Sequence, residues 1–513
     1  MLFAPRSALI RRFVLSFALL TAVLLPGKVW SADSASAEAP RESWNVIFIS
    51  GTRVGYTRST LQKTTADGKT IWKSNTDTHL VIRRFGQDLK MQHHLETTET
   101  DDGDMLTFRY EMHNPPAQSS AASGEVVDGK LKLTTSIFGV PLTRTFPFDK
   151  EVKSPAYQDR LLEQNPLKVG ETRKFKVFIP EYNKPSTITM KAGKEVEVSL
   201  LEEKKEKLLQ VQVTQTLIPG VVTQIFLNPK SEAMKTATAM LGTEMTSYLV
   251  SRDEALKEVA AGELDLGVET LVVVAPIPEA HHTSRVQYKV TVPETDLESA
   301  LPKGNSQEVK NVGEGTAMVT VRSLRPTNTK DLPLEKPADE YRQPSRFLQS
   351  DNAKVQAHAK EAAGAETDSW KVARLLERYV YEKLTRKDFS TAMASAAEVA
   401  ESLQGDCTEH ACLLAAMARA RGIPARVAVG LVYVPSKHAF GGHMWTEVNI
   451  DNHWIPVDAT LGQGGIGAAH IKLADSSLAD DSVSPGASFL PLVNLLGKMK
   501  IEVIKVEGPN ATP

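Results

Sequence analysis

The chain has only two cysteines, almost no net charge and no long apolar run beyond its N-terminus. Two cysteines in 513 residues exclude a disulfide scaffold and a four-cysteine zinc site. A formal net charge of −2 is untypical of general nucleic-acid binders, which carry a basic excess, so we expect no nucleic-acid partner. After residue 40, no apolar run reaches the roughly 20 residues that span a bilayer. The 41% of hydrophobic residues suffices for buried cores, and the length predicts two to four domains of roughly 150 residues.

Residues 1–31 have the layout of a secretory signal peptide. Three arginines precede an uncharged apolar stretch from Phe13 to Leu25, and a proline, a glycine and small residues follow. Cleavage near Ser31 or near Ala37 would fit this pattern. We therefore expect an exported protein, periplasmic or secreted, that keeps no transmembrane segment after cleavage; the alternative is an uncleaved membrane anchor.

The two cysteines, Cys407 and Cys412, are five residues apart. On one helix their Cα atoms would be roughly 8 Å apart and point in different directions, which is beyond the reach of a disulfide. Either this segment is not helical, or an exported chain keeps two free thiols. A free thiol retained in an oxidising compartment needs a reason, and chemistry is one.

Residues 42–322 read as a β-rich accessory region of antiparallel strands. Apolar residues alternate with polar ones, as in Leu106 to Met112, and Asp-Gly pairs at 67–68, 102–103 and 128–129 favour tight hairpin turns. This pattern fits one large twisted sheet or two sandwich-like modules. A capping box predicts one helix from Ser251 to Ala261.

The histidine pairs in this region, at 93–94 and 281–282, are candidate metal ligands. Adjacent residues on a strand face opposite ways, so we interpret these histidines as solvent-exposed instead. Four prolines among polar residues at 323–345 predict a linker and a domain boundary.

The last predicted domain, 346–513, is α+β and holds the candidate chemistry. Asp368 can cap a helix with an apolar stripe, and an alanine-rich helix runs to about Leu403. Cys407 then opens a helix that ends at Gly422, so the helix dipole would favour its thiolate. Cys412 lies deeper and reads as a core residue. The stripe consists of Val372, Leu375, Leu376 and Tyr379.

A hairpin that turns at Asp451 and Asn452 brings two further polar residues together. With a two-residue loop, Ile450 pairs with His453, and His443 becomes the diagonal neighbour of Asp458 on one face. Diagonal neighbours are roughly 7–8 Å apart at the backbone, within reach of a His–carboxylate hydrogen bond. A three-residue loop would separate them to opposite faces.

Cys407, His443 and Asp458 are thus candidates for a nucleophile, its base and the orienting acid. Trp445 shares the face of His443 and would wall the site from water. A metal site from Cys407, His410 and Cys412 is disfavoured, because helix positions i and i+5 do not face together. We expect neither a metal nor a cofactor.

Four blocks of this segment resemble the transglutaminase-like cysteine-enzyme superfamily. They are G-D-C-T-E-H-A at 405–411, R-A-R-G-I-P-A-R at 419–426, G-G-H-M-W-T-E-V at 441–448 and H-W-I-P-V-D-A-T at 453–460. The resemblance covers roughly residues 350–475 and departs slightly at 459–460, where Ala-Thr replaces the usual Pro-Thr.

The resemblance implies a papain-like cysteine-enzyme fold. It implies Cys407 as nucleophile, His443 as base and Asp458 as orienting acid, and acyl transfer on peptide or amide bonds through a thioester. Water as acceptor makes a protease or amidase, and an amine makes a protein cross-linker. Gln404 and the backbone N–H of Cys407 are candidate oxyanion donors.

The expected partner is a protein or peptide substrate, which an exported enzyme would meet in the cell envelope. The competing hypothesis is a catalytically silent scaffold or binding protein of the cell envelope. At the C-terminal end, the alternation of residues 500–506 predicts a strand of the catalytic domain's sheet. The apolar stretch 489–496 predicts core or a short helix.

Overall fold

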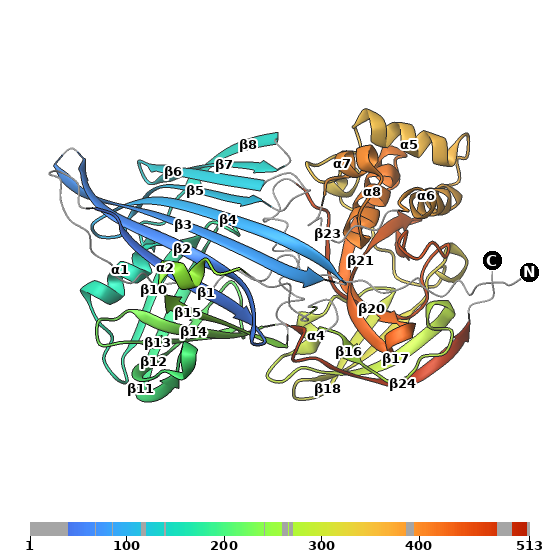
Figure 1. Ribbon diagram of the computed structural model, residues 1–513. Coiled ribbons are helices and arrows are strands. Elements are labelled where there is room, and N and C mark those ends of the chain that lie inside the picture. Colours follow the sequence, from blue (N-terminus) through green and yellow to red (C-terminus); the bar gives the residue numbers. More distant parts are fainter. Residues whose placement is uncertain are drawn as a thin grey trace, which may run out of the picture. The chain divides into compact units, whose positions relative to one another are not determined.

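The computed structural model describes residues 39–66, 68–84, 86–113, 120–137, 140–240, 242–258, 265, 270–385, 394–479 and 495–509. The expected signal peptide, 1–31, lies outside the described residues, as does most of 489–496, of which Leu495 and Leu496 are buried. No helix of the described residues is long and apolar enough to cross a membrane. Contacts divide the chain between Asp265 and Leu266 into two compact units, which we call the N-terminal and the C-terminal unit (Figure 1).

The N-terminal unit is built on one sheet of 15 strands, in the order β8-β7-β6-β5-β4-β3-β2-β1-β15-β14-β13-β12-β11-β10-β9. Neighbouring strands are antiparallel except β9 and β10. One sheet rather than two sandwiches therefore accounts for residues 41–250. The strands are β1 (Arg41–Ile49), β2 (Thr52–Ala66), β3 (Lys69–Arg84), β4 (Gln87–Thr100), β5 (Met105–His113), β6 (Ser120–Val127), β7 (Lys130–Ile137), β8 (Val140–Pro147), β9 (Val152–Lys153), β10 (Thr172–Ile179), β11 (Lys184–Ser199), β12 (Lys205–Gln215), β13 (Val222–Leu227), β14 (Ala233–Met240) and β15 (Thr243–Val250).

Tight turns join many of these strands, as the Asp-Gly pairs predict. Asp128 and Gly129 both have positive φ, which a two-residue hairpin loop requires, and they connect β6 to β7. A core cluster with members on β5, β7, β9 and β10 brings strands from both halves of the sheet together.

Short helices complete the N-terminal unit: α1 (Tyr157–Gln164), α2 (Arg252–Ala255) and the 3-10 turn η1 (Leu201–Glu203). Ser251 caps α2 by accepting the backbone N–H of Glu254, as the capping box predicts, but α2 ends at Ala255 rather than at 261. On α1, the buried Arg160 bonds to the buried Glu99 at 2.6 Å and fixes the helix against β4.

The C-terminal unit contains two sheets. In the first, β16 (Val272–Val273), β21 (Ala439–Ile450), β20 (Ala425–Val434) and β23 (His470–Ser476) lie in that order, and β22 (His453–Val457) pairs with β21. In the second, the order is β18 (Gln307–Gly313), β19 (Thr316–Arg322), β17 (Thr283–Thr291) and β24 (Lys500–Pro509). The strand expected at 500–506 is therefore present, but it pairs with β17 rather than with the sheet that holds His443.

This division differs from the boundary expected at 323–345. The strands β17 to β19, which lie within the expected region 42–322, belong to the C-terminal unit because they pair with β24. The segment 323–345 forms only the 3-10 turns η3 (Pro326–Asn328) and η4 (Asp339–Tyr341), as its prolines predict. It packs on the C-terminal unit, where Tyr341 contacts the ring of Trp454.

Helix α8 (Cys407–Ala420) lies at the centre of the C-terminal unit. It packs on β20 and β21 and is surrounded by α5 (Ala353–Ala363), α6 (Ser369–Lys383) and α7 (Ala396–Ser402). Its residues 407–419 are all buried, which is typical of a helix enclosed on every side. Asp368 caps α6 as predicted, but Leu375 of the expected apolar stripe is exposed. The remaining short elements are α4 (Leu297–Ala300), η2 (Ala280–His282) and η5 (Pro435–Lys437).

Candidate active site

Cys407 is the first residue of α8, as predicted, and a capping box holds this helix end. Asp406 accepts the backbone N–H of Thr408 at 2.9 Å, and its own N–H donates to Glu409 at 2.8 Å. Gly405 precedes the cap at φ +138°. The thiol of Cys407 is 1% exposed and lies 3.5 Å from Asp406 Oδ1. The helix end favours a thiolate, whereas the nearby carboxylate opposes it.

Glu409 is a fully buried carboxyl group in this helix end. Burial, together with the Asp406 carboxylate, raises the pKa of Glu409 well above its ordinary value. The hydroxyl of Thr408 lies 2.9 Å from an oxygen of Asp406 and 2.9 Å from one of Glu409. A hydroxyl has one hydrogen, so it can donate to only one of them. The side chains of Asp406, Thr408 and Glu409 are thus bonded to one another around the first turn of α8.

The hairpin of β21 and β22 has the predicted register. Ile450 pairs with His453, and Asp451 and Asn452 between them have positive φ. Asp458 directly follows β22, and its Oδ2 lies 2.5 Å from Nε2 of His443. The two-residue loop thus brings the predicted base and the predicted orienting acid into contact, and Nδ1 is the ring nitrogen of His443 that does not face Asp458.

Asp458 is ionised in this environment. It is 1% exposed, and burial alone would raise its pKa. The charge of His443 and the hydrogen bonds from His443 and His470 outweigh burial and hold the pKa of Asp458 well below its ordinary value. Its other oxygen, Oδ1, accepts the backbone N–H of Thr460 at 2.8 Å. The carboxylate is therefore fixed in orientation as well as in charge.

Two contacts set the direction of α8 along β21. The hydroxyl of Thr446 donates to the carbonyl of Ala411 at 2.9 Å, and the N–H of Asn449 donates to the carbonyl of Pro424, just beyond the helix, at 2.8 Å. The helix α8 and the strand β21 therefore run in the same direction. Cys407 lies one turn before Ala411, and His443 lies three residues before Thr446. The backbones of Cys407 and His443 thus lie toward the same end of the helix–strand pair.

Trp445, the predicted site wall, lies beside His443, and its role as a wall stays a prediction. Its side chain is 2% exposed, and its ring stacks near His443 with 6.0 Å between centroids and 27° between planes. Ala428 and Ile466 pack against it. Gln404, the candidate oxyanion donor, is half-buried in the segment that leads from α7 to Gly405. Its role stays a prediction.

The sequence reasoning missed one histidine of this cluster, His470 at the start of β23. Its Nε2 lies 3.1 Å from Asp458 Oδ2, the same oxygen that His443 contacts. Its ring lies 5.5 Å from that of His443 and 5.3 Å from that of Trp445, between centroids. Burial lowers the pKa of His470, although the Asp458 carboxylate opposes this shift. Local sequence holds no signal for this contact, because β23 reaches the site by pairing with β20.

The expectation that the paired histidines are exposed is wrong for three of the four. His281 is buried, 6.0 Å from the ring of His470, and burial lowers its pKa to about 3. His93 and His94 are half-buried on β4, where they bond to Tyr110 and Asp77 respectively. Only His282 is exposed. Alternation on a strand does not apply to His281, which lies in η2. His93 and His94 do face different partners, but side chains of the neighbouring strands β5 and β3 cover them.

One group of described residues has ligand atoms close enough together to suit a metal ion: His443, Asp458 and His470. The separations of 2.5 and 3.1 Å are those of hydrogen bonds. Tetrahedral zinc with bonds of about 2.0–2.1 Å would hold its ligand atoms about 3.3 Å apart. Hydrogen bonding accounts for the cluster as it stands. His410 of the disfavoured metal set bonds instead to the carbonyl of Asp406, at 2.5 Å.

Glu377 of α6 supports the residues around Asp458. Its carboxyl accepts the backbone N–H of Asp458 at 3.4 Å and that of Gly465 at 3.1 Å. It is 1% exposed, and burial, with the Asp458 charge nearby, raises the pKa of Glu377 to about 7. These contacts tie the start of the loop that leads from Asp458 toward β23 to its middle, at Gly465.

A buried charge network joins the strands behind the site. Glu447 accepts hydrogen bonds from Arg426 at 2.7 Å and from Lys472 at 3.1 Å, and both cations also pair with Asp475. Burial would raise the pKa of Glu447, but the two cations hold it below its ordinary value. These pairs tie β20, β21 and β23 together.

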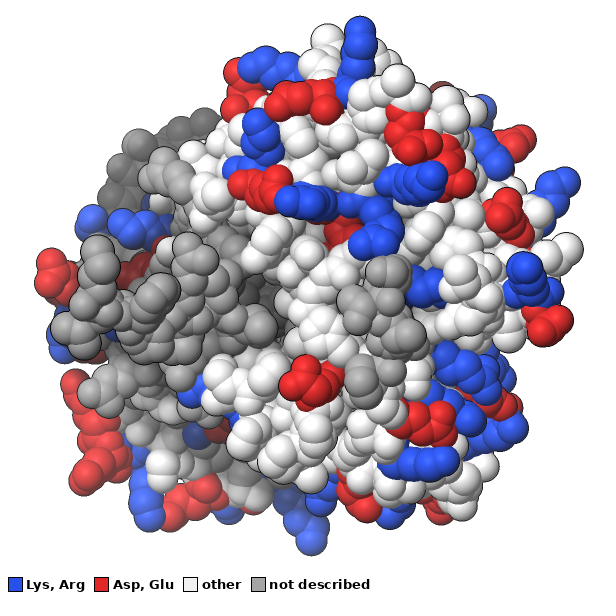
Figure 2. Space-filling view, turned by 90° about the vertical axis from the view of Figure 1, so that its right-hand side faces the viewer, with Lys and Arg blue, Asp and Glu red and all other residues white. Residues whose placement is uncertain are grey.

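The face of the molecule drawn in Figure 2 carries basic and acidic side chains interspersed. Ion pairs join such groups on the helices of the C-terminal unit, among them Arg378 with Glu382 and Lys383 with Glu361. A face of mixed charge gives little electrostatic attraction for a polyanion.

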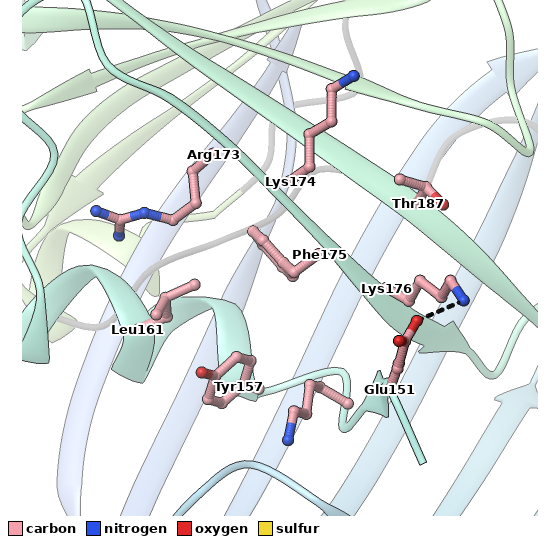
Figure 3. A pocket seen from close by; sticks show the side chains of 9 residues that line it. Glu151, Tyr157, Leu161, Arg173, Lys174, Phe175, Lys176 and Thr187 are labelled. Carbon is pink, nitrogen blue, oxygen red and sulfur yellow. Dashed lines mark hydrogen bonds and ion pairs between the residues drawn. The ribbon is translucent and has the colours of Figure 1, made fainter. Parts of the chain in front are cut away.

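A separate pocket of about 460 Å³ lies in the N-terminal unit between α1 and β10. Tyr157, Leu161 and Phe175 form its apolar side (Figure 3). The basic side chains at its rim are largely neutralised, for example Lys176 by Glu151 at 2.8 Å (Figure 3). The described residues that line this pocket include no cysteine and no histidine, so none of the predicted catalytic side chains is among them.

Residues 356–459 match the family model of the transglutaminase-like superfamily. The chain therefore carries a transglutaminase-like domain, in the unit that holds α8 and the β21–β22 hairpin. The expected fold class is confirmed: a large N-terminal sheet with a C-terminal transglutaminase-like domain of helices and sheets. The search of curated proteins gave no match.

Three solved structures are distantly similar. A proposed cysteine protease from Cytophaga hutchinsonii is 20% identical over 45% of this chain and 91% of its own, with a TM-score of 0.28. A protein with a domain of unknown function from Brucella abortus is 13% identical over 41% and 96%, with a TM-score of 0.32. A proposed protease from Parabacteroides distasonis is 10% identical over 69% and 64%, with a TM-score of 0.19. These TM-scores are all below 0.5, so no conclusion rests on these likenesses.

Proposed function

We propose that the C-terminal unit is a cysteine-dependent acyl-transfer enzyme acting on peptide or amide bonds. The observation that carries this proposal is the buried 2.5 Å contact between His443 and Asp458, in a domain that also starts a central helix with Cys407. A buried imidazole–carboxylate pair beside a thiol at a helix N-terminus is the arrangement that nucleophilic catalysis by cysteine requires.

The reaction follows from the roles of the three side chains. His443 Nδ1 takes the proton of the Cys407 thiol, and the sulfur attacks the carbonyl carbon of the amide. The tetrahedral intermediate collapses to a thioester as His443 returns the proton to the leaving amine. Water or an amine then attacks the thioester, gives its proton to His443 and releases an acid or a new amide, and the proton returns to the thiolate.

Asp458 and Trp445 act on His443 rather than on the substrate. The ionised carboxylate holds Nε2–H, so Nδ1 faces the thiol and the imidazolium formed in the first step is stabilised. Trp445 covers one side of the ring and keeps water away from the ion pair, which strengthens its attraction. Gln404 and the backbone N–H of Cys407 are the proposed donors to the oxyanion.

The choice of acceptor and the location are also part of the proposal. Hydrolysis would make the protein a peptidase or amidase, and transfer to an amine would make it a protein cross-linker. The sequence of residues 1–31 supports export, so the proposed substrate is a protein or peptide of the periplasm, the cell envelope or the exterior.

One observation favours the alternative of a silent scaffold: the thiol of Cys407 is buried and lies beside the carboxylate of Asp406. Such a protein would bind cell-envelope partners without reacting with them. Reactivity of the thiol separates the two hypotheses.

Alkylation by iodoacetamide between pH 5 and 8, read by peptide mass spectrometry, tests the proposal. Cys412 is the internal control, because it is fully buried and burial raises its pKa well above the ordinary value. We expect Cys407 to react at least tenfold faster than Cys412 at pH 6, and His443→Ala to remove this difference. Equal rates for the two thiols would support the silent scaffold.

A second measurement identifies the acceptor. Peptide mixtures incubated with a fluorescent primary amine report hydrolysis as new termini and transfer as incorporated label. Cys407→Ala should abolish both without unfolding the domain, and Asp458→Asn should leave weak activity. Full activity in Cys407→Ala protein would contradict the thioester mechanism.

A further inference from the structure

Two imidazoles share one carboxylate oxygen in the candidate site. Oδ2 of Asp458 lies 2.5 Å from Nε2 of His443 and 3.1 Å from Nε2 of His470. An ionised carboxylate only accepts hydrogen bonds, so each of these nitrogens must carry a hydrogen. Both rings therefore present Nε2–H to the same atom.

His470 is held in place independently of His443. Its ring is 2% exposed and meets Trp445 edge to face at 5.3 Å. Its strand is fixed on β20 by backbone pairing, where Gly430 permits a close approach: a Cβ at this position would lie 2.0 Å from the carbonyl oxygen of Ile471. The Nε2–H of His470 is thus aimed at Asp458 by the sheet itself.

We propose that His470 is a positioning residue of the acyl-transfer site, holding Asp458 Oδ2 in line with His443. The proposal rests on the proposed function. Without His470, Oδ2 keeps a single side-chain donor in a buried space, and the Thr460 N–H on Oδ1 is the other bond that resists rotation of the carboxylate about its bond to Cβ. His470 also draws charge from the carboxylate and so sets how tightly Asp458 holds a protonated His443.

The surroundings of His470 offer few other groups that could produce the same effect. His281 of η2 lies edge-on to His470, 6.0 Å between centroids, and Glu377 of α6 contacts the backbone of Asp458. Arg325 lies near Glu377, and Arg374 lies near Arg325. Among the described residues, none of these four donates to Asp458 Oδ2, whereas His443 and His470 do. His281 is therefore a suitable control, because it is a buried imidazole of the same cluster.

The pH profile of alkylation by iodoacetate tests this role on the full chain. Iodoacetate is an anion, so it reacts fastest when Cys407 is a thiolate and His443 is still an imidazolium, and its rate rises and then falls with pH. The fall reports the loss of the His443 proton. This limb depends on Asp458 and therefore on His470.

Three substitutions of His470 separate positioning from packing. His470→Leu removes the donor. His470→Gln keeps an amide N–H the same number of bonds from the backbone as Nε2, whereas His470→Asn keeps the amide but is one bond shorter. His281→Leu is the control for loss of a buried ring.

We expect the leucine and asparagine variants to lower the peak rate of alkylation about tenfold. The falling limb should move up by about half a pH unit or more, because a carboxylate with one donor fewer holds the imidazolium of His443 more tightly. The glutamine variant and His281→Leu should match the native protein. If the leucine variant does not fold, the comparison of the asparagine variant with the glutamine variant still separates positioning from packing.

Two results would overturn the positioning role alone. One is that the native protein shows a bell-shaped profile and that the asparagine and leucine variants show its falling limb at the same pH. The other is zinc in the purified native protein, lost in these variants, which would assign a metal site instead. A native protein with no bell-shaped profile would overturn the proposed function, and the role of His470 with it.

Discussion

Replacing Gly405 by alanine should destabilise the helix end that carries Cys407. Gly405 has φ +138°, where residues with a side chain are strained by about 1–3 kcal/mol. A Cβ there would lie 2.3 Å from Cγ and 2.4 Å from Cβ of Glu409. Glu409 would have to move and would lose its bonds to the N–H groups of Asp406 and Ala394, at about 1 kcal/mol for a lost cap.

The expected loss of stability for Gly405→Ala is therefore about 2–4 kcal/mol. Gly422, just beyond the other end of α8, is the matched control. It has φ +77°, and a Cβ there would meet nothing within 4 Å, so alanine should cost only about 1–2 kcal/mol of backbone strain.

Labelling of Cys412 measures the difference without requiring the two units to unfold together. Cys412 is fully buried in α8, so its rate of alkylation in increasing urea reports unfolding of this helix. At equal urea, the thiol should be labelled about 5–30 times faster in Gly405→Ala than in Gly422→Ala protein. Equal rates in the two variants would refute the reasoning about the contact with Glu409.

Three other outcomes are expected. Arg419 is buried and donates four hydrogen bonds to backbone carbonyls of three segments. Arg419→Met should therefore lower the free energy of unfolding, measured by urea denaturation, by about 3–5 kcal/mol. The control Arg421→Met, at a more exposed position, should lower it much less, and similar losses would contradict this. The pKa of Glu377 is about 7 in the folded state and about 4.5 in the unfolded state, so its contribution to stability falls as pH rises from 4.5 to 7. Glu377→Gln should flatten that fall in the free energy of unfolding by up to about 3 kcal/mol. If the free energies of unfolding of the two proteins change in parallel with pH, Glu377 is not responsible. Cys407 and Cys412 are both free thiols, so a reducing agent should leave the melting temperature unchanged, and a large fall would reveal a disulfide.

The parts of the candidate site that depend on nearby residues could be predicted from the sequence. The register of the hairpin at Asp451 and Asn452 follows from a loop of two residues, and it brings His443 to Asp458. The start of α8 at Cys407 follows from the Gly405-Asp406 pair and the capping residue three positions after Asp406. In both cases the determining contacts lie within a few residues of each other.

The parts that depend on distant pairing could not be predicted. His470 reaches Asp458 because β23 pairs with β20 across a connection of about 35 residues, and alternation within a strand does not name its neighbour. The same limit applies to β17, whose pattern resembles that of the first 15 strands although it pairs with β24 more than 200 residues later. Leu375 shows a third case: it fits an apolar stripe, but its side chain is exposed.

The order of strands in the N-terminal unit has a consequence for how that unit is made. β1 is paired on one side with β2 and on the other with β15, whereas the two edges of the sheet, β8 and β9, are consecutive in the chain. A chain synthesised from its N-terminus therefore completes β1 to β8 while one side of β1 still has no partner. At about 5–20 residues per second, the roughly 200 residues that separate β1 from β15 take about 10–40 s to appear. For that time the middle of the finished sheet is an open edge able to pair with another chain, and the last strand to arrive closes the centre of the sheet.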